Sequence, residues 1–249
     1  MYFRYFLYFV TYLVAIISLY RVAAFVHEIL HQKNNPSFNK YFTWLWNLTA
    51  GLFILLPSPT FNAHLNHHKV DIFGTHNDEQ YVLINGVGGW KHQLLLFLAL
   101  PYLLPIACII RVCLYPIDAI FKTSIQTKFY SLLYKKQKFS ESDIKLLRLS
   151  ELYYFIITVV FGCICWHTPK LFLVWYWVSF GAWFLSAMRI PLEHSLAVHN
   201  DSVSFENQIE DSFNRPNGIL GLIIQPLGLN RHKDHHKNPN KPYYLLNKK

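Results

Sequence analysis

The sequence predicts an all-α, polytopic helical membrane protein, and three observations support that fold class. The chain has 249 residues, of which 53% are hydrophobic and only 15% are charged, whereas soluble domains average about 25% charged residues. Several apolar runs are long enough to cross a bilayer or to enter it. Histidines gather directly beside these runs. The length suits one membrane domain over residues 1–249.

The first element is an apolar run over residues 5–26, interrupted only by Arg21. About 22 residues at 1.5 Å each cross the hydrocarbon core of roughly 30 Å. The run lacks the small-residue cleavage site of a signal peptide, so we expect a retained transmembrane helix. It continues into His27 and His31, which are four residues apart and therefore lie on one helix face.

The second apolar run, residues 44–56, is about 13 residues long and too short for a span. It precedes the cluster His64, His67 and His68. If this cluster shares a site with His27 and His31, both must lie on the same side of the membrane. We therefore expect the run to dip in and return, or to lie in the interface.

The third apolar run, residues 94–113, contains Pro101 and Pro105 and precedes the most basic stretch of the chain, residues 122–148. The positive-inside rule places that stretch in the cytoplasm. If the histidines also face the cytoplasm, residues 94–113 must form a broken, re-entrant or interfacial pair of half-helices.

Two further apolar runs, residues 152–166 and 171–188, are joined by a short turn and predict a transmembrane hairpin. Ser140 begins a helix-start signal before the first of them. The hairpin returns the chain to the histidine side at His194, so every cluster lies on one face. The last apolar piece, residues 219–229, is too short to span, and we expect it to pack against the helix ends.

The spacing HxxHH occurs twice, at His64–His68 and His232–His236. With 13 histidines in 249 residues, about 0.03 chance copies are expected. Imidazole suits iron, zinc, copper and nickel. One metal rarely takes more than about six ligands, so nine candidates predict a two-metal site with open positions. The candidate ligands are His27, His31, His64, His67, His68, His194, His232, His235 and His236.

Four other histidines, namely His76, His92, His167 and His199, have no spacing partner, and we expect structural or surface roles for them.

Two other classes of protein compete with a two-metal enzyme. The segment from His27 to His31 matches HExxH, the motif of a zinc membrane metalloprotease, but this leaves both HxxHH copies unexplained. A non-catalytic metal-binding membrane protein would show loose histidine tracts instead.

The net charge of +9 indicates cytoplasmic loops and contact with anionic lipid. Nucleic acid is not expected as a partner, because no basic stripe with interleaved aromatics lies outside the membrane-flanking segments.

These motifs resemble those of the membrane fatty acid desaturase superfamily, which includes desaturases and related hydroxylases. The resemblance lies in three histidine boxes in order, with a further histidine after the hairpin. Short sequence segments beside the boxes are similar too, namely Phe73-Gly-Thr75 after the second box and Pro226-Leu-Gly-Leu229 before the third. It covers residues 20–246.

The resemblance implies a non-haem di-iron centre on the cytoplasmic face of an integral, multi-pass protein. Dioxygen is the co-substrate, and the expected reaction introduces a double bond into a fatty acyl or other lipid chain. A lipid or alkane hydroxylase is the alternative. Electrons would come from a separate ferredoxin or b-type cytochrome. Carboxylates that orient the ligands would come from Glu28, Asp71, Asp78, Glu193 and Asp211.

Overall fold

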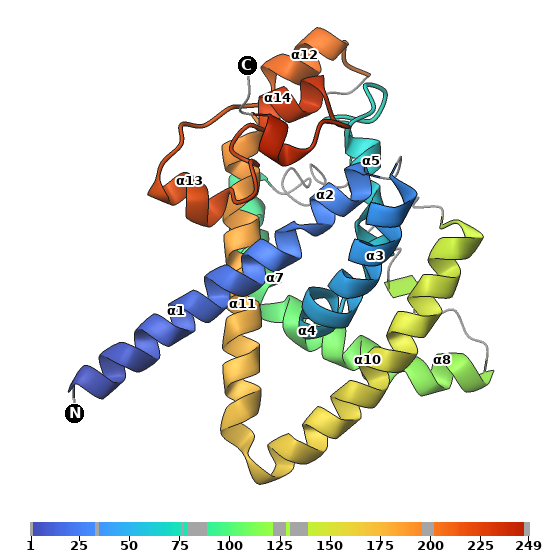
Figure 1. The fold of residues 1–249 in the computed structure, drawn as a ribbon, viewed down its shortest axis with the longest axis vertical. Helices are drawn as coiled ribbons and strands as arrows, with labels where there is room; N and C mark the ends of the chain where they lie inside the picture. The colour runs from blue at the N-terminus through green and yellow to red at the C-terminus, as the bar shows by residue number, and fades with distance from the viewer. Residues whose placement is uncertain are drawn as a thin grey trace.

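The computed structural model describes residues 2–32, 35–75, 77–78, 89–121, 128–129, 139–195 and 202–246. These residues form helices joined by turns, and no strand occurs among them (Figure 1). The predicted all-α class is confirmed. Among the described helices, four are long and apolar enough to cross a membrane: Tyr2–His31, Leu98–Phe121, Glu141–His167 and Pro169–Glu193.

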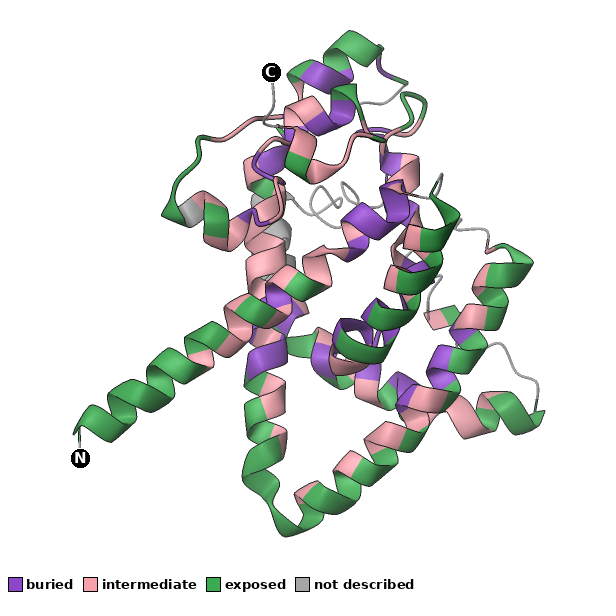
Figure 2. Cartoon of the chain, viewed as in Figure 1, coloured by how far each residue is buried: buried purple, intermediate pink, exposed green. Residues whose placement is uncertain are grey.

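The N-terminal helix α1 (Tyr2–Ala24) continues through Phe25 into the short helix α2 (Val26–His31). Most of α1 exposes its side chains, whereas α2 is largely buried (Figure 2). Exposed apolar residues on a long helix are expected where lipid is the solvent. The helix predicted at residues 5–26 is confirmed, and it carries His27 and His31 into the interior.

The segment that precedes the second histidine box reverses direction. Helix α3 (Pro36–Trp46) continues as a π-helical turn η1 (Asn47–Gly51) and as α4 (Leu52–Ile54). Leu55 then adopts a left-handed conformation with φ of 56° and ends the helix. The 3-10 helix η2 (Ser58–Ala63) brings the chain back to α2 and leads into α5 (His64–His67). A path that enters and returns was expected here, and its depth in a bilayer stays a prediction.

The third apolar run is one helix, α7 (Gly89–Cys113), which contains both Pro101 and Pro105. The structure shows one continuous helix where two half-helices were expected, and a re-entrant or interfacial position of this run stays a prediction. Each proline removes one backbone donor, but in lipid neighbouring helices help to hold such a helix together, and α7 packs along α10 and α11. The helix α8 (Tyr115–Phe121) follows it.

The hairpin consists of α10 (Glu141–His167) and α11 (Pro169–Glu193), as the sequence predicts. Ser140 caps α10 in a capping box with Asp143. Helix α11 also crosses α1, and the contact depends on Gly181. A Cβ at this position would lie only 2.6 Å from Cδ1 of Ile16.

Chain parity restricts how α7 can cross a bilayer. His67 and His194 lie side by side, with their Nε2 atoms 3.1 Å apart. An even number of complete crossings must therefore separate them, and the α10–α11 hairpin supplies two. A third complete crossing by α7 alone would make the number odd.

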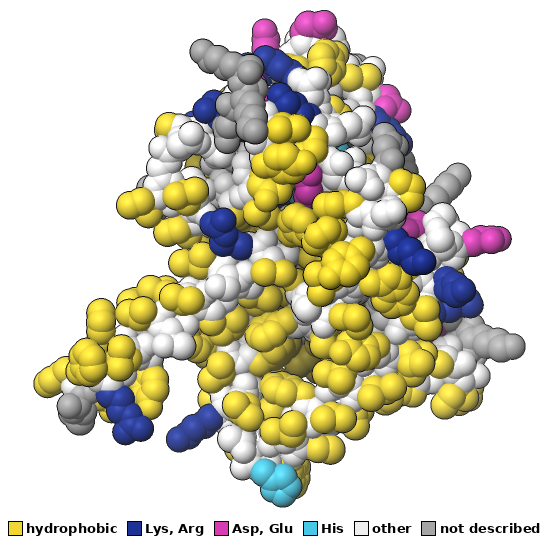
Figure 3. Space-filling view, in the orientation of Figure 1, with side chains coloured by type: hydrophobic (Ala, Val, Ile, Leu, Met, Phe, Trp, Pro, Cys, Tyr) yellow, Lys and Arg dark blue, Asp and Glu magenta, His cyan; other side chains and the backbone are white. Residues whose placement is uncertain are grey.

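The C-terminal part forms short helices over the histidine end of the bundle: α12 (Phe205–Glu210), α13 (Ile219–Ile224) and α14 (His232–Lys237). As predicted, α13 is too short to span, and Ile219 and Leu222 are exposed. Figure 3 shows hydrophobic side chains over most of the face below α2 and α3. Charged side chains gather mainly at the end that carries α12 and α14.

Candidate metal centre

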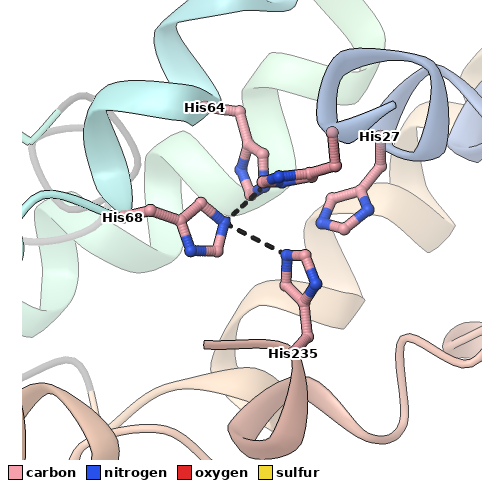
Figure 4. Close-up of side chains that lie close together, drawn as sticks. His27, His64, His68 and His235 are labelled. Carbon is pink, nitrogen blue, oxygen red and sulfur yellow. Dashed lines mark hydrogen bonds between the residues drawn. The ribbon is translucent and has the colours of Figure 1, made fainter. Parts of the chain in front are cut away.

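Five histidines, carried by α2, α5 and α14 or directly next to them, converge on one point. We call them the five-histidine cluster: His27, His31, His64, His68 and His235. Figure 4 shows the rings of His27, His64, His68 and His235 pointing toward a common centre. The Nε2 atom of His68 lies 3.1 Å from that of His64 and 3.1 Å from that of His235. The Nε2 atom of His27 is buried without a hydrogen-bond partner among the described residues. Such an atom fits a metal ligand.

Four further histidines form a second group, which we call the four-histidine cluster: His67, His194, His232 and His236. All four side chains are buried. Nε2 of His194 lies 3.1 Å from Nε2 of His67 and 2.9 Å from Nε2 of His232. Nε2 of His236 lies 3.0 Å from that of His232. In each cluster the candidate ligand atoms lie within 4.8 Å of one another, so all nine predicted residues are brought together.

The histidine spacing explains how each HxxHH box serves both clusters. Residues four apart on a helix share a face, and each i, i+4 pair belongs to one cluster: His27 with His31, His64 with His68, and His232 with His236. The remaining histidine of each HxxHH box, His67 or His235, belongs to the other cluster. The two boxes therefore hold the clusters next to each other.

The separations between ring nitrogens match those of metal ligands. Metal–imidazole bonds are about 2.1 Å long, so nitrogens bound at right angles lie about 3.0 Å apart and tetrahedral ones about 3.4 Å apart. The closest separations are 2.9–3.1 Å. They are short enough for several rings to share one metal. An all-imidazole donor set suits iron, zinc, copper and nickel.

Burial favours the neutral form of most of the clustered histidines. It lowers the pKa of these rings, because the charged form loses its hydration, and repulsion from neighbouring histidines lowers the pKa further. Neutral rings offer a lone pair to a metal at neutral pH. The histidines outside the candidate spans whose pKa lies well below its usual value of 6.5 are His64, His68, His194, His232, His235 and His236.

One carboxylate orients a ligand directly. Oδ2 of Asp78 lies 2.7 Å from Nδ1 of His67, and the backbone N–H of Gly74 donates to the same oxygen at 2.8 Å. Both side chains are buried. When Nδ1 donates to the carboxylate, Nε2 of His67 is left to face a metal. Asp78 therefore has the geometry expected of a carboxylate that orients a candidate ligand ring.

The other expected carboxylates differ in position. Oε2 of Glu193 lies 3.8 Å from Nδ1 of His232, near the ring but beyond hydrogen-bond distance. Glu28 accepts from the backbone N–H of Tyr243 at 3.3 Å, and Asp211 accepts from the hydroxyl of Ser195 at 2.8 Å. Asp71 is exposed. Sequence position alone did not separate Asp78 from these residues.

The four histidines without a spacing partner lie away from both clusters or outside the described residues. His167 is exposed at the turn between α10 and α11, which agrees with the expected surface role. His76 and His199 lie outside the described residues, as does the side chain of His92 and most of the basic stretch.

The turn before α14 aims the last box. Gly228 has a φ of 73°, and a Cβ there would lie 3.0 Å from the carbonyl oxygen of Tyr243. The carbonyl oxygen of Gly228 accepts a hydrogen bond from the backbone N–H of Arg231, the residue immediately before His232. The amide of Asn214 also donates to Asp234 inside α14 at 2.9 Å. These contacts fix the orientation of the helix that carries three candidate ligands.

A buried ion pair that the sequence analysis missed supports the second box. Arg111 on α7 is paired with Glu151 on α10, and it also donates to the carbonyl oxygen of Leu55, where the re-entrant path reverses. Both side chains are almost fully buried. The signal in the sequence was one charged residue within, or at the edge of, each of two apolar runs, and ionisable residues there are rare and functional or structural.

A cavity of about 100 Å³ lies against the five-histidine cluster. His27 and His64 form part of its wall, and most of the rest is apolar, with Ile54, Phe61 and Trp183 among the larger side chains. No residue of the four-histidine cluster lines it among the described residues. An apolar group can therefore approach the centre from the five-histidine side.

Comparison with known proteins agrees with this geometry. The chain matches the family described as Fatty acid desaturase over residues 4–249. It is 26% identical over 263 residues to a protein named Ceramide hydroxylase from Caulobacter vibrioides (strain NA1000 / CB15N), covering 95% of this chain and 70% of that protein. No solved structure matches.

Proposed function

The chain belongs to the fatty acid desaturase family, and from this premise we propose that it is a membrane oxidoreductase which uses two irons and dioxygen to oxidise an unactivated C–H bond in the alkyl chain of a lipid. The observation that carries the proposal is the convergence of nine histidines into groups of five and four. With about six positions around each metal, groups of five and four histidines would leave positions for dioxygen.

A two-iron centre is favoured over the zinc protease by the use that it makes of all three histidine boxes. The zinc protease alternative requires the glutamate of the HExxH motif to activate water. In this chain Glu28 accepts a hydrogen bond from the backbone N–H of Tyr243. The second and third boxes would also have no role in such a protease, whereas a two-metal centre uses every box.

When bound, two irons supply the activation of dioxygen and the removal of hydrogen from carbon. The residues of the chain do the rest. The imidazoles stay neutral and leave the metal charge uncompensated, and Asp78 holds the ring of His67 in one orientation. The apolar cavity beside His27 and His64 holds an alkyl group at the metal and keeps water away from it.

We place hydroxylation first among the two possible outcomes. Both outcomes consume one dioxygen, two electrons and two protons: hydroxylation yields an alcohol and one water, and desaturation yields a double bond and two waters. The relative named Ceramide hydroxylase favours hydroxylation. Desaturation is the second candidate, and the family description favours it.

The two electrons come from a separate donor in this proposal, either a ferredoxin or a b-type cytochrome. The histidine face is placed in the cytoplasm, where such donors occur. Exposed Lys145 and Arg148 near the start of α10 support this orientation, because basic residues gather in cytoplasmic segments.

Lipid analysis tests the proposal. The chain, its His235→Ala variant and its His167→Ala variant are expressed in a host without a homologue, and the lipids are analysed by mass spectrometry. The chain and His167→Ala should both modify a host lipid. An alcohol product gains one oxygen atom, about 16 mass units, and an alkene product loses two hydrogen atoms, about 2 mass units. His235→Ala should yield at least about a hundredfold less product. No lipid change with a fully metallated protein and a supplied electron donor would contradict the proposal.

A further inference from the structure

Arg189 lies in the wall of the cavity that reaches the five-histidine cluster. Its side chain is only 16% exposed, and NH1 lies 3.6 Å from Oε1 of Glu193, beyond direct hydrogen-bond distance. Its Nε is buried without a hydrogen-bond partner among the described residues. A guanidinium carries five N–H donors in a planar fork, and buried donors without partners cost free energy. An acceptor bound in the cavity would satisfy the Nε–H donor of Arg189.

The charge around Arg189 selects the kind of acceptor. The carboxylate of Glu193 lies 3.6 Å from the guanidinium and offsets its positive charge when ionised. A second anion, such as a fatty acid carboxylate or a phosphate, then gains little net attraction in this poorly hydrated site. A neutral oxygen acceptor meets no such repulsion. Ser186, three residues earlier on the same face of α11, lines the cavity as well and offers a hydroxyl.

The size of the cavity limits how much of a lipid lies beside the metal. A cavity of about 150 Å³ takes up one benzene molecule, and this one measures about 100 Å³. The cavity is partly open, and its enclosed part has room for a polar group and only a few carbon atoms. A site for mid-chain oxidation would need space for many carbons on both sides of the reacting one.

We propose that Arg189 binds the neutral carbonyl oxygen of an amide- or ester-linked acyl chain and so directs oxidation to a carbon within about three bonds of that carbonyl. This rests on the proposed lipid oxidation and adds its substrate class and position. The ligand is an intact acyl lipid rather than a free fatty acid. Arg189 acts as a binding and specificity residue, because its fork can hold one oxygen while the neighbouring carbons face His27 and His64.

A purely structural role for Arg189 is the competing explanation. Arg189 faces Glu193, which in turn lies 3.8 Å from Nδ1 of His232. If Arg189 served only to hold this carboxylate, its loss would disturb the four-histidine cluster. Arg189→Gln would then lose one metal per chain, and Glu193→Gln would reproduce its effects. Substrate binding predicts instead that Arg189→Gln keeps both metals.

Binding is measured first, on the full-length metallated protein in detergent. The probes are N-hexylhexanamide and hexanoate, and the readout is tryptophan fluorescence, with Trp183→Phe showing that the signal arises at the cavity. The amide should bind more tightly than hexanoate. Arg189→Gln should weaken amide binding by roughly tenfold or more, the effect of losing a hydrogen bond to a charged group, while the exposed Arg148→Gln should bind as the unaltered chain does. Equal amide binding by Arg189→Gln, or a preference for hexanoate, would overturn the proposal.

The position of oxidation is the second readout. Fragmentation mass spectrometry of the product should place the new oxygen or double bond within three bonds of the carbonyl. Arg189→Lys, which keeps the charge but loses the fork, should raise KM more than it lowers kcat and spread the product over further positions. Mid-chain oxidation by the unaltered chain would overturn the role of Arg189 while leaving lipid oxidation intact. If no lipid is oxidised at all, the proposed function fails, and the binding measurement still decides whether Arg189 recognises a carbonyl.

Discussion

At the scale of single residues, neighbouring histidines have different tasks. His67 and His68 are adjacent in sequence, yet one belongs to the four-histidine cluster and the other to the five-histidine cluster, and the same holds for His236 and His235. A hydrogen bond to Asp78 fixes the ring of His67. The metals are therefore expected to respond separately to substitutions at adjacent positions.

Removing the charge of Asp78 should weaken metal binding without emptying the protein of histidine ligands. In Asp78→Asn the ring of His67 loses its charged acceptor, and partners of this kind are worth about 10–100-fold in metal affinity. A chelator competition measured by residual iron checks this value. The exposed Asp71→Asn is the matched control and should retain its metal. Equal iron retention by both variants would show that Asp78 does not orient a ligand.

The nine histidines could be found from sequence, because the i, i+3 and i+4 spacing shows which rings share a helix face. Their division into five and four could not. It depends on where α2, α5 and α14 meet, and on His194 at the end of α11. The same limit applies to the carboxylates: Asp78 reaches a ring only because the turn at Gly74 folds back onto it.

At the scale of the elements, the Arg111–Glu151 pair connects α7, α10 and the turn at Leu55. That turn ends the path that leads to His64. A buried pair of this kind contributes little net stability when compared with apolar residues, but breaking it leaves one charge uncompensated. The pair therefore fixes the position of the second box more than it adds stability.

Arg111→Met should destabilise the fold by about 3–5 kcal/mol, because Glu151 is left buried without its partner. The double variant Arg111→Met with Glu151→Met should recover much of that loss, although the carbonyl of Leu55 still lacks its donor. Thermal unfolding followed by size-exclusion fluorescence gives the order of stability. A double variant no more stable than the single one would contradict this account.

Helix α7 shows why element prediction was incomplete. Two prolines in an apolar run predicted a break, and the reason for expecting it was sound, since each proline removes a donor. Packing against α10 and α11 keeps the helix continuous, and this tertiary contact is not written in the local sequence. The hairpin, by contrast, followed directly from two long apolar runs and a short polar turn.

At the scale of the whole molecule, all nine histidines and the C-terminal helices lie at one end, and the turn of the α10–α11 hairpin lies at the other (Figure 1). If the histidine end faces the cytoplasm, the hairpin turn faces the opposite compartment. The proposed orientation rests on the basic residues near α10 and on the proposed source of electrons, and it can be measured directly.

Single cysteines placed in a background with the four native cysteines replaced by alanine should report the orientation. Thr168→Cys, at the exposed hairpin turn, should react with a membrane-impermeant maleimide in intact cells. Glu206→Cys, exposed on α12, should react only after the membrane is permeabilised. The reverse pattern would place the histidine face on the outer side.

The central claim is that one chain binds two metals, one in each histidine cluster. The measurement that tests it most directly is the metal content of the purified protein by mass spectrometry, compared among the unaltered chain, His235→Ala and His236→Ala. The account predicts two irons per chain, with each variant losing iron from a different cluster and retaining about one. A single zinc per chain, or the loss of all metal together in both variants, would contradict it.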